Sequence, residues 1–93
     1  MSSRIAILEA KRTPIGKFLG AFRNLPAVKL GAHVAREVLA SSGTAPGSVD
    51  EVIFGHARQA GSGPNPARQV TMGAGIPESV TATTVNAACG SGM

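Results

Sequence analysis

The sequence has no tryptophan and no tyrosine, and phenylalanine supplies only three aromatic side chains in 93 residues. It therefore lacks most of the rings on which nucleic-acid bases stack. The net charge is +4, and Lys11, Arg12, Lys17 and Arg23 crowd the first quarter of the chain without forming a long basic run. This pattern argues against nucleic-acid binding and favours a solvated or interface-buried patch, with a phosphate-bearing small ligand as the alternative.

Cysteine is almost as scarce as the large aromatic residues. Cys89 is the only one, which excludes an internal disulfide and is typical of a reduced cytosolic protein. No apolar stretch reaches the roughly 18 residues that a membrane-spanning helix needs. The opening MSSRIAILEA lacks the apolar core and cleavage site of a signal peptide. These absences predict a cytoplasmic protein with no membrane partner.

Three short runs of apolar and β-branched residues predict strands. The runs are RIAILEA, SVDEVIFGHA and SVTATTVNA, and they place the strands near residues 4–9, 50–56 and 79–87. The prolines and glycines of KRTPIGKFLGAFRNLP predict a long loop over residues 11–26. A loop of this length is usually functional or part of an interface.

Two helices are expected between these strands. Residues 27–43 carry apolar side chains at steps of three and four, which gives one broad apolar face, and Gly43 suits the end of the helix. A shorter helix follows, with Asn65 as N-cap, Pro66 in its first turn and an end near Gly75. The order β-α-β-α-β is typical of an α/β fold with a largely parallel sheet covered by helices.

Several residue groups match binding motifs only weakly. The glycine-rich stretches GSGPNPARQ and GAGIP fit neither a G-x-x-x-x-G-K-[ST] loop nor a dinucleotide-binding loop, so turns and caps are favoured over a nucleotide site. His33, His56 and Cys89 show no spacing typical of a zinc site, and we expect no metal. Both histidines are interpreted as structural or exposed residues.

Cys89 lies where the third predicted strand meets a glycine-rich turn, CGSG. If a third helix begins here, its unpaired N–H groups and its dipole favour the thiolate over the thiol. The same N–H groups would stabilise an oxyanion formed on an attacked thioester carbonyl, and Gly90 and Gly92 leave room for an acyl group. The position favours a nucleophile, with an inert packing residue as the alternative.

These residues resemble those of the thiolases, which form or cleave 3-ketoacyl-CoA thioesters. VNAACGSGM resembles the active-site segment N-x-x-C-x-S-G, and ILEAKRTPIGKFLGAFR resembles the amino-terminal R-T-P-x-G stretch. LGAHVAREVL, VDEVIFGHA and GSGPNPARQVTMGAGIP are similar to the segments that follow in the family, in the same order. The NPARQ and CGSG forms are more similar to biosynthetic acetyl-CoA C-acetyltransferases (acetoacetyl-CoA thiolases) than to degradative thiolases.

The resemblance implies a five-layer α-β-α-β-α fold of two similar halves, with residues 1–93 as the incomplete start of the first half. It implies that Cys89 is the nucleophile, which becomes acylated to an enzyme thioester. Deprotonated acetyl-CoA would then attack this thioester in a Claisen condensation that gives acetoacetyl-CoA, and thiolysis would be the reverse reaction. Coenzyme A and acetyl-CoA would be substrates rather than bound cofactors, and the Cys89 N–H would be one oxyanion donor.

The resemblance also implies that further machinery follows Met93. In the family, a histidine that activates the nucleophile, a second cysteine and most CoA-binding residues come later, and neither His33 nor His56 matches them. We therefore expect the remainder of the same enzyme as a partner, and a homo-oligomer. The alternatives are another condensing enzyme of the superfamily, of the ketoacyl synthase type, and a non-catalytic thiolase-like subunit.

Overall fold

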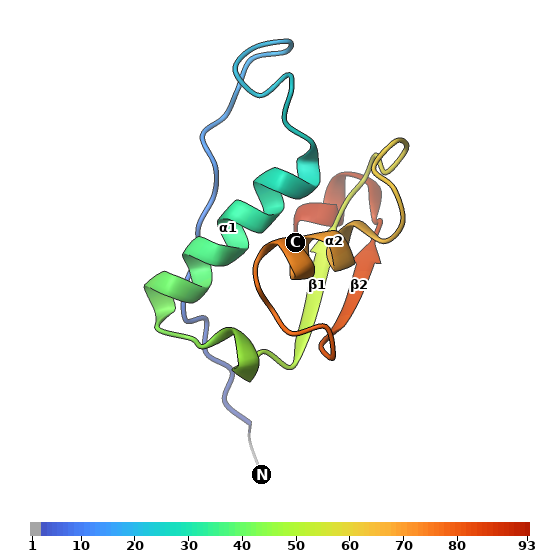
Figure 1. Ribbon diagram of the computed structural model, residues 1–93. Coiled ribbons are helices and arrows are strands. Elements are labelled where there is room, and N and C mark those ends of the chain that lie inside the picture. The colour runs from blue at the N-terminus through green and yellow to red at the C-terminus, as the bar shows by residue number, and fades with distance from the viewer. Residues whose placement is uncertain (1–2) are drawn as a thin grey trace.

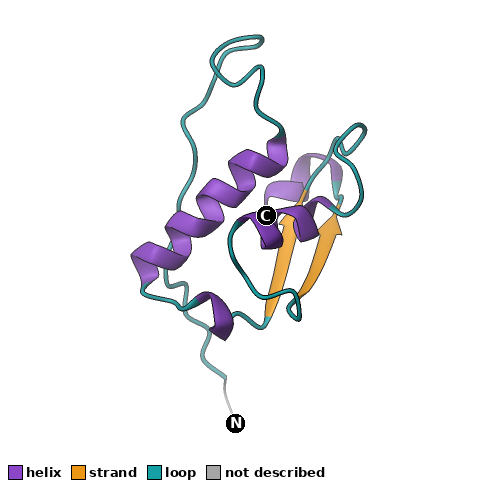
Figure 2. Ribbon diagram, viewed as in Figure 1, coloured by secondary structure: helices purple, strands orange, loops and turns teal. Residues whose placement is uncertain are grey.

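The computed structural model describes residues 3–93, which form a two-stranded parallel sheet with helices against one of its faces (Figure 1). The elements in chain order are α1 (Ala27–Ser42), the 3-10 turn η1 (Pro46–Ser48), β1 (Glu51–Gly55), α2 (Pro66–Gly73), β2 (Thr81–Val85) and the 3-10 turn η2 (Ala88–Gly92). Figure 2 shows a long loop before α1 and another between β1 and α2. The helix α2 is the crossover that joins the two parallel strands.

The core lies between the helices and one face of the sheet. Alternate residues of a strand point to opposite faces, so Val52 is 8% exposed, whereas Ile53 on the other face is 59% exposed. Val52 packs with Ala74, Ile76 and Val80. Residues of α1 and both strands complete this cluster, which fixes where the strands end relative to the helices.

The helix over residues 27–43 forms almost as predicted, since α1 ends at Ser42 and Gly43 takes a left-handed φ of 69° as its C-cap. The helix approaches α2 closely through small side chains. A Cβ on Gly73 would lie 2.9 Å from the Cβ of Ala32, and Ala32 is itself buried. Small residues at this crossing therefore let the two helices pack close together.

Asn65 forms the predicted N-cap of α2 and also joins this helix to β2. Its Oδ1 accepts from the backbone N–H of Arg68 at 3.4 Å and from the Thr84 hydroxyl at 2.7 Å. Its Nδ2 donates to the Ala82 carbonyl at 3.1 Å, and the Thr84 hydroxyl accepts from the Ala67 N–H at 2.9 Å.

The helix ends at Gly73, two residues before the predicted Gly75.

Replacing Asn65 with alanine is expected to lower the free energy of unfolding by about 1–2 kcal/mol, the usual loss at an N-cap. Asn65 has a φ of 36°, which alanine tolerates poorly, and the variant also loses the bonds to β2. Urea unfolding of the intact protein measures the change. Glycine accepts this φ, so the smaller loss of stability expected for Asn65→Gly would measure the side-chain hydrogen bonds alone. An Asn65→Ala variant as stable as the native protein would refute the role of Asn65 as N-cap.

The strand predicted over residues 4–9 is wrong, because this segment has no regular structure. In the described part of the chain the sheet contains only β1 and β2, which pair with each other, and neither pairs with this segment. Ile5 and Ile7 are 94% and 88% exposed, which means that they also lack an apolar surface to cover. An apolar β-type run becomes a strand only where a sheet edge receives it.

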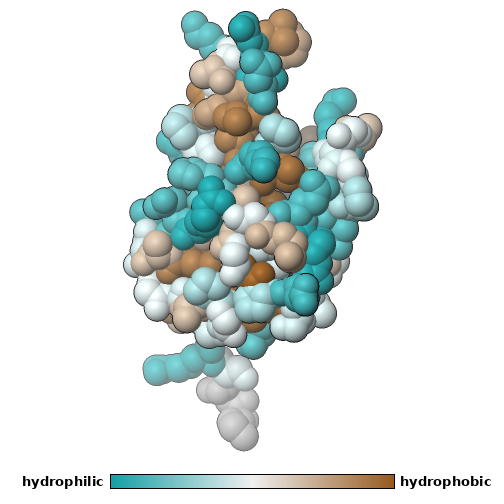
Figure 3. Space-filling model, viewed as in Figure 1, coloured by the Kyte–Doolittle hydropathy of each residue, from teal (hydrophilic) through white to brown (hydrophobic). Residues whose placement is uncertain are grey.

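The predicted loop over residues 11–26 is confirmed and protrudes from one end of the molecule (Figure 1). Phe18 and Ile15 on this loop are almost fully exposed. Figure 3 shows apolar surface at this end as well as across the middle of the same face. Between residues 3 and 93, no helix combines the length and the apolar character needed to cross a lipid bilayer.

Candidate functional site

The loops that follow β1 and β2 meet at one edge of the sheet. Parallel strands end at the same edge, and the register pairs Gly55 with Val85 as the last residues of each strand. The pairing continues by one bond, from the His56 N–H to the Val85 carbonyl at 2.9 Å. Asn86 then donates from Nδ2 to the carbonyl of Ala57 at 3.1 Å, which ties the two loops together.

Cys89 lies on this edge as the second residue of η2 and is exposed with a free thiol. The predicted helical element after the third strand is thus present as a 3-10 turn, which begins one residue before Cys89. Ala88 has a φ of 49°, so the backbone bends sharply just before the cysteine. The side chain of Cys89 is open to a reagent or a substrate rather than packed in the core.

Three of the four backbone N–H groups around Cys89 are already used. The Ala87 N–H donates to the Ser91 hydroxyl at 2.9 Å, and the Ala88 N–H donates to Oδ1 of Asn86 at 2.9 Å. The Gly90 N–H donates to the carbonyl of Ala87 at 2.9 Å. Within residues 3–93 the N–H of Cys89 itself donates to no group, so it is free to bind an oxygen of a ligand.

The cysteine turn, defined as residues 86–92, rests against the end of β1 at Gly55. A Cβ built on Gly55 would lie 1.6 Å from the carbonyl oxygen of Ser91 and 2.5 Å from its carbonyl carbon. No side chain fits in that space, because both contacts are to backbone atoms. The absence of a side chain at Gly55 therefore sets how closely the turn approaches the sheet.

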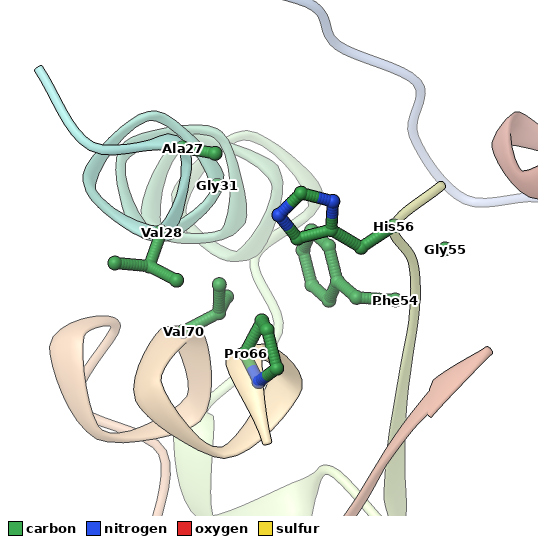
Figure 4. Close-up of a pocket in the computed structure, with 8 residues that line it drawn as sticks. All are labelled: Ala27, Val28, Gly31, Phe54, Gly55, His56, Pro66 and Val70. Carbon is green, nitrogen blue, oxygen red and sulfur yellow. The ribbon is translucent and has the colours of Figure 1, made fainter. Parts of the chain in front are cut away.

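A mostly apolar cavity of about 130 Å³ lies on the helix side of the same edge (Figure 4). Its walls come from the start of α1, the end of β1 and α2, namely Ala27, Val28, Gly31, Phe54, Gly55, His56, Pro66 and Val70. Cys89 does not line it. The cavity and the thiol therefore do not share a lining residue. Gly55 lines the cavity and also contacts the cysteine turn at Ser91.

Neither His33 nor His56 forms a hydrogen bond with Cys89 within residues 3–93. His56 lines the cavity, and its Nε2 lies 3.1 Å from the hydroxyl of Ser62, whereas His33 is exposed on α1. In residues 3–93, no three His, Cys, Asp or Glu side chains come close enough together to hold a metal ion.

Sequence reasoning identified Cys89 but missed the residues that hold its turn. Asn86 and Ser91 lie in the VNAACGSGM segment, yet only the cysteine and the glycines were given roles. Gly55 lies within the strand predicted near residues 50–56, and the sequence indicates no part for it in the site. The asparagine directly after a strand was a usable signal, since asparagine side chains often bond the backbone two residues on.

The sequence is similar to one family model and to two curated relatives with the same description. A family model described as "Thiolase, N-terminal domain" matches residues 5–93. A probable acetyl-CoA acyltransferase of Staphylococcus epidermidis is 50% identical over 91 residues, and one of Staphylococcus aureus is 48% identical over 91 residues. Each match covers 98% of this chain and 23% of the relative, so the chain spans less than a quarter of the length of these curated relatives.

Solved structures agree with the sequence matches. The crystal structure of the Acat5 thiolase from Ascaris suum in complex with coenzyme A has a TM-score of 0.84 at 38% identity, over 86% of this chain and 21% of that chain. The acetyl-CoA acetyltransferase of Bacillus anthracis has a TM-score of 0.81 at 41% identity, over 86% of this chain and 20% of that chain. These similarities confirm the α/β fold class predicted from the sequence.

Proposed function

The chain belongs to the thiolase family, as its motifs predicted, and on this premise we propose that it is the amino-terminal part of an acetyl-CoA acyltransferase with Cys89 as nucleophile. The observation that carries the proposal is the exposed thiol next to its own N–H, which has no partner within residues 3–93, at the edge where both strands end. Within residues 3–93 the thiol is not packed among core side chains.

The first half-reaction transfers the acetyl group to the cysteine. The Cys89 sulfur attacks the thioester carbonyl of acetyl-CoA, and the Cys89 N–H donates to the oxygen that becomes negatively charged. The carbon–sulfur bond to coenzyme A then breaks, coenzyme A leaves as its thiol after gaining a proton, and the acetyl group stays on Sγ. The Cys89 N–H would be one donor to this oxyanion, and a second donor from the rest of the enzyme would complete the pair.

The second half-reaction forms the carbon–carbon bond. A second acetyl-CoA loses a proton from its methyl group, and the resulting carbanion attacks the acetyl thioester on Cys89. The Sγ–acyl bond breaks, acetoacetyl-CoA is released and the thiol is regenerated. Thiolysis is the same sequence in reverse, with the coenzyme A thiol as the attacking group.

The groups that remove and return these protons lie outside the chain in this proposal. Among the hydrogen bonds of residues 3–93, the His56 ring pairs with Ser62 and neither histidine pairs with Cys89, and this chain corresponds to about a quarter of the relatives named acetyl-CoA acyltransferase. We therefore assign residues 1–93 to an incomplete amino-terminal portion, with the rest of the same enzyme supplying the acid, the base and most of the coenzyme A contacts. A homo-oligomer and a cytoplasmic location stay predictions.

Alkylation with iodoacetamide tests the proposal. In the intact protein, Cys89 is expected to be alkylated within minutes near neutral pH, because the proposal makes it an accessible nucleophile and its thiol is exposed. Preincubation with acetyl-CoA should protect it and leave one acetyl group on the peptide that contains Cys89. Peptide mapping by mass spectrometry measures both outcomes.

The controls separate the alternative functions. Cys89→Ser reports alkylation at any other residue, and coenzyme A without an acetyl group reports protection by binding alone. Slow alkylation with no acetylation would contradict the proposal and favour a non-catalytic subunit. Acylation by an acyl carrier protein thioester, but not by acetyl-CoA, would favour the ketoacyl synthase type.

A further inference from the structure

Asn86 uses both ends of its side-chain amide although the residue is exposed. The Nδ2 donates to the Ala57 carbonyl, 29 positions away in the sequence, and Oδ1 accepts from the Ala88 N–H. The amide can adopt only this orientation, because a carbonyl must accept and a backbone N–H must donate. A single side chain thus links the loop after β1 to the backbone immediately before Cys89.

The bond to Ala88 acts at the most strained residue of the cysteine turn. A left-handed φ is unfavourable for any residue with a Cβ, and Ala88 holds a φ of 49°. The hydrogen bond from its N–H to Asn86 favours this conformation over the extended one. Because Ala88 precedes Cys89, its backbone angles decide the direction of the Cys89 N–H and of the Cα–Cβ bond.

The bond to Ala57 acts on the turn as a whole. The turn contacts β1 at Gly55, through the Ser91 carbonyl, and Asn86 adds a second point of attachment on the loop two residues beyond. The contact at Gly55 and the hydrogen bond to Ala57 together restrict rotation of the turn more than either does alone. The Asn86 amide therefore orients the turn as well as its local backbone.

We infer that Asn86 is a positioning residue, which holds the Cys89 thiol and N–H in the direction that acyl transfer requires. This inference rests on the proposed function for its consequence in catalysis. Asn86 itself need not touch the substrate, since both of its amide groups are occupied by the protein. Its loss should therefore lower the rate of the chemical step more than the affinity for acetyl-CoA.

Two variants separate the contributions of the two hydrogen bonds that the Asn86 side chain makes. Asn86→Ala removes both bonds, while Asn86→Ser keeps a short oxygen that can accept from the Ala88 N–H but cannot reach Ala57. In the intact protein, kcat for the alanine variant is expected to fall by about 10²-fold, with KM for acetyl-CoA within about twofold of native. The serine variant should recover part of the loss. The alanine substitution of Asn24, which is exposed on the loop of residues 11–26, is the matched control.

Iodoacetamide alkylation of Cys89 and thermal unfolding are measured on the same variants. Slower alkylation at temperatures where the variant is fully folded would support positioning. If Asn86→Ala lowers the melting temperature but alkylates and turns over at the native rate per folded molecule, the inference is wrong and Asn86 is only structural. If acetyl-CoA never acetylates native Cys89, the proposed function fails, and the alkylation rates still decide whether Asn86 positions the thiol.

Discussion

Alanine at position 89 is expected to reduce acetoacetyl-CoA formation in the intact protein by about 10⁴-fold or more. The proposed reaction proceeds through a covalent thioester on Sγ, and alanine offers no atom on which the acetyl group can be carried. When catalytic residues act as a unit, removal of the nucleophile alone typically costs about as much as removal of the whole set. Product formation from acetyl-CoA, followed by chromatography, measures the loss.

The stability of the Cys89→Ala variant should remain close to native, because the cysteine side chain is exposed and makes no hydrogen bond within residues 3–93. Thermal unfolding is the control that separates lost chemistry from lost structure. Retention of substantial turnover by a well-folded Cys89→Ala variant would exclude Cys89 as the acyl carrier.

Alanine at position 55 should disturb both stability and the cysteine turn. The added Cβ would lie 1.6 Å from the Ser91 carbonyl oxygen, which is far inside van der Waals contact, so the backbone of the turn has to move. Gly55 does not have a left-handed φ, which means that alanine can adopt its backbone angles and the effect is steric. We expect a loss of about 1–3 kcal/mol in the free energy of unfolding, the usual range for overpacking.

The displacement should also appear at Cys89. Because Ser91 lies two residues after the cysteine, iodoacetamide alkylation of Cys89 in Gly55→Ala is expected to differ from native at temperatures where the variant is folded. Gly47→Ala is the matched control, since a Cβ there meets no atom within 4 Å and its φ is not left-handed. Native stability and native alkylation in Gly55→Ala would show that the turn does not rest on β1 as the structure has it.

The helices and two of the strands could be predicted because their signals are local. The apolar spacing of residues 27–43 defines a helix face, and Asn65 followed by proline marks a helix start, whatever the rest of the chain does. The Val- and Thr-rich run that contains β2 has a similarly local preference. The segment of residues 4–9 carries the same kind of signal and still fails to form a strand, because pairing depends on a neighbour that local sequence does not provide.

Cys89 could be proposed as the nucleophile from the sequence because its chemistry and its motif are contained in a few consecutive residues. The bond of Asn86 to Ala88 is local enough to be predicted, but its second bond and the role of Gly55 were not predictable, since each involves a residue that is distant along the chain. Asn86 bonds Ala57, and Gly55 makes room for Ser91. Contacts of this kind exist only after the two strands have paired and brought their ends to one edge.

The amino-acid sequence by itself determined the family, the helix and strand preferences and the identity of the thiol, because each depends on residue type and on short spacings. Only the tertiary structure decided that the thiol is exposed, that its N–H is left unpaired and that Gly55 and Asn86 hold its turn. The physical reason is that exposure and hydrogen-bond satisfaction depend on every segment packed nearby. Residue preferences are present in the unfolded chain, whereas exposure and hydrogen-bond pairing are set only when the chain folds.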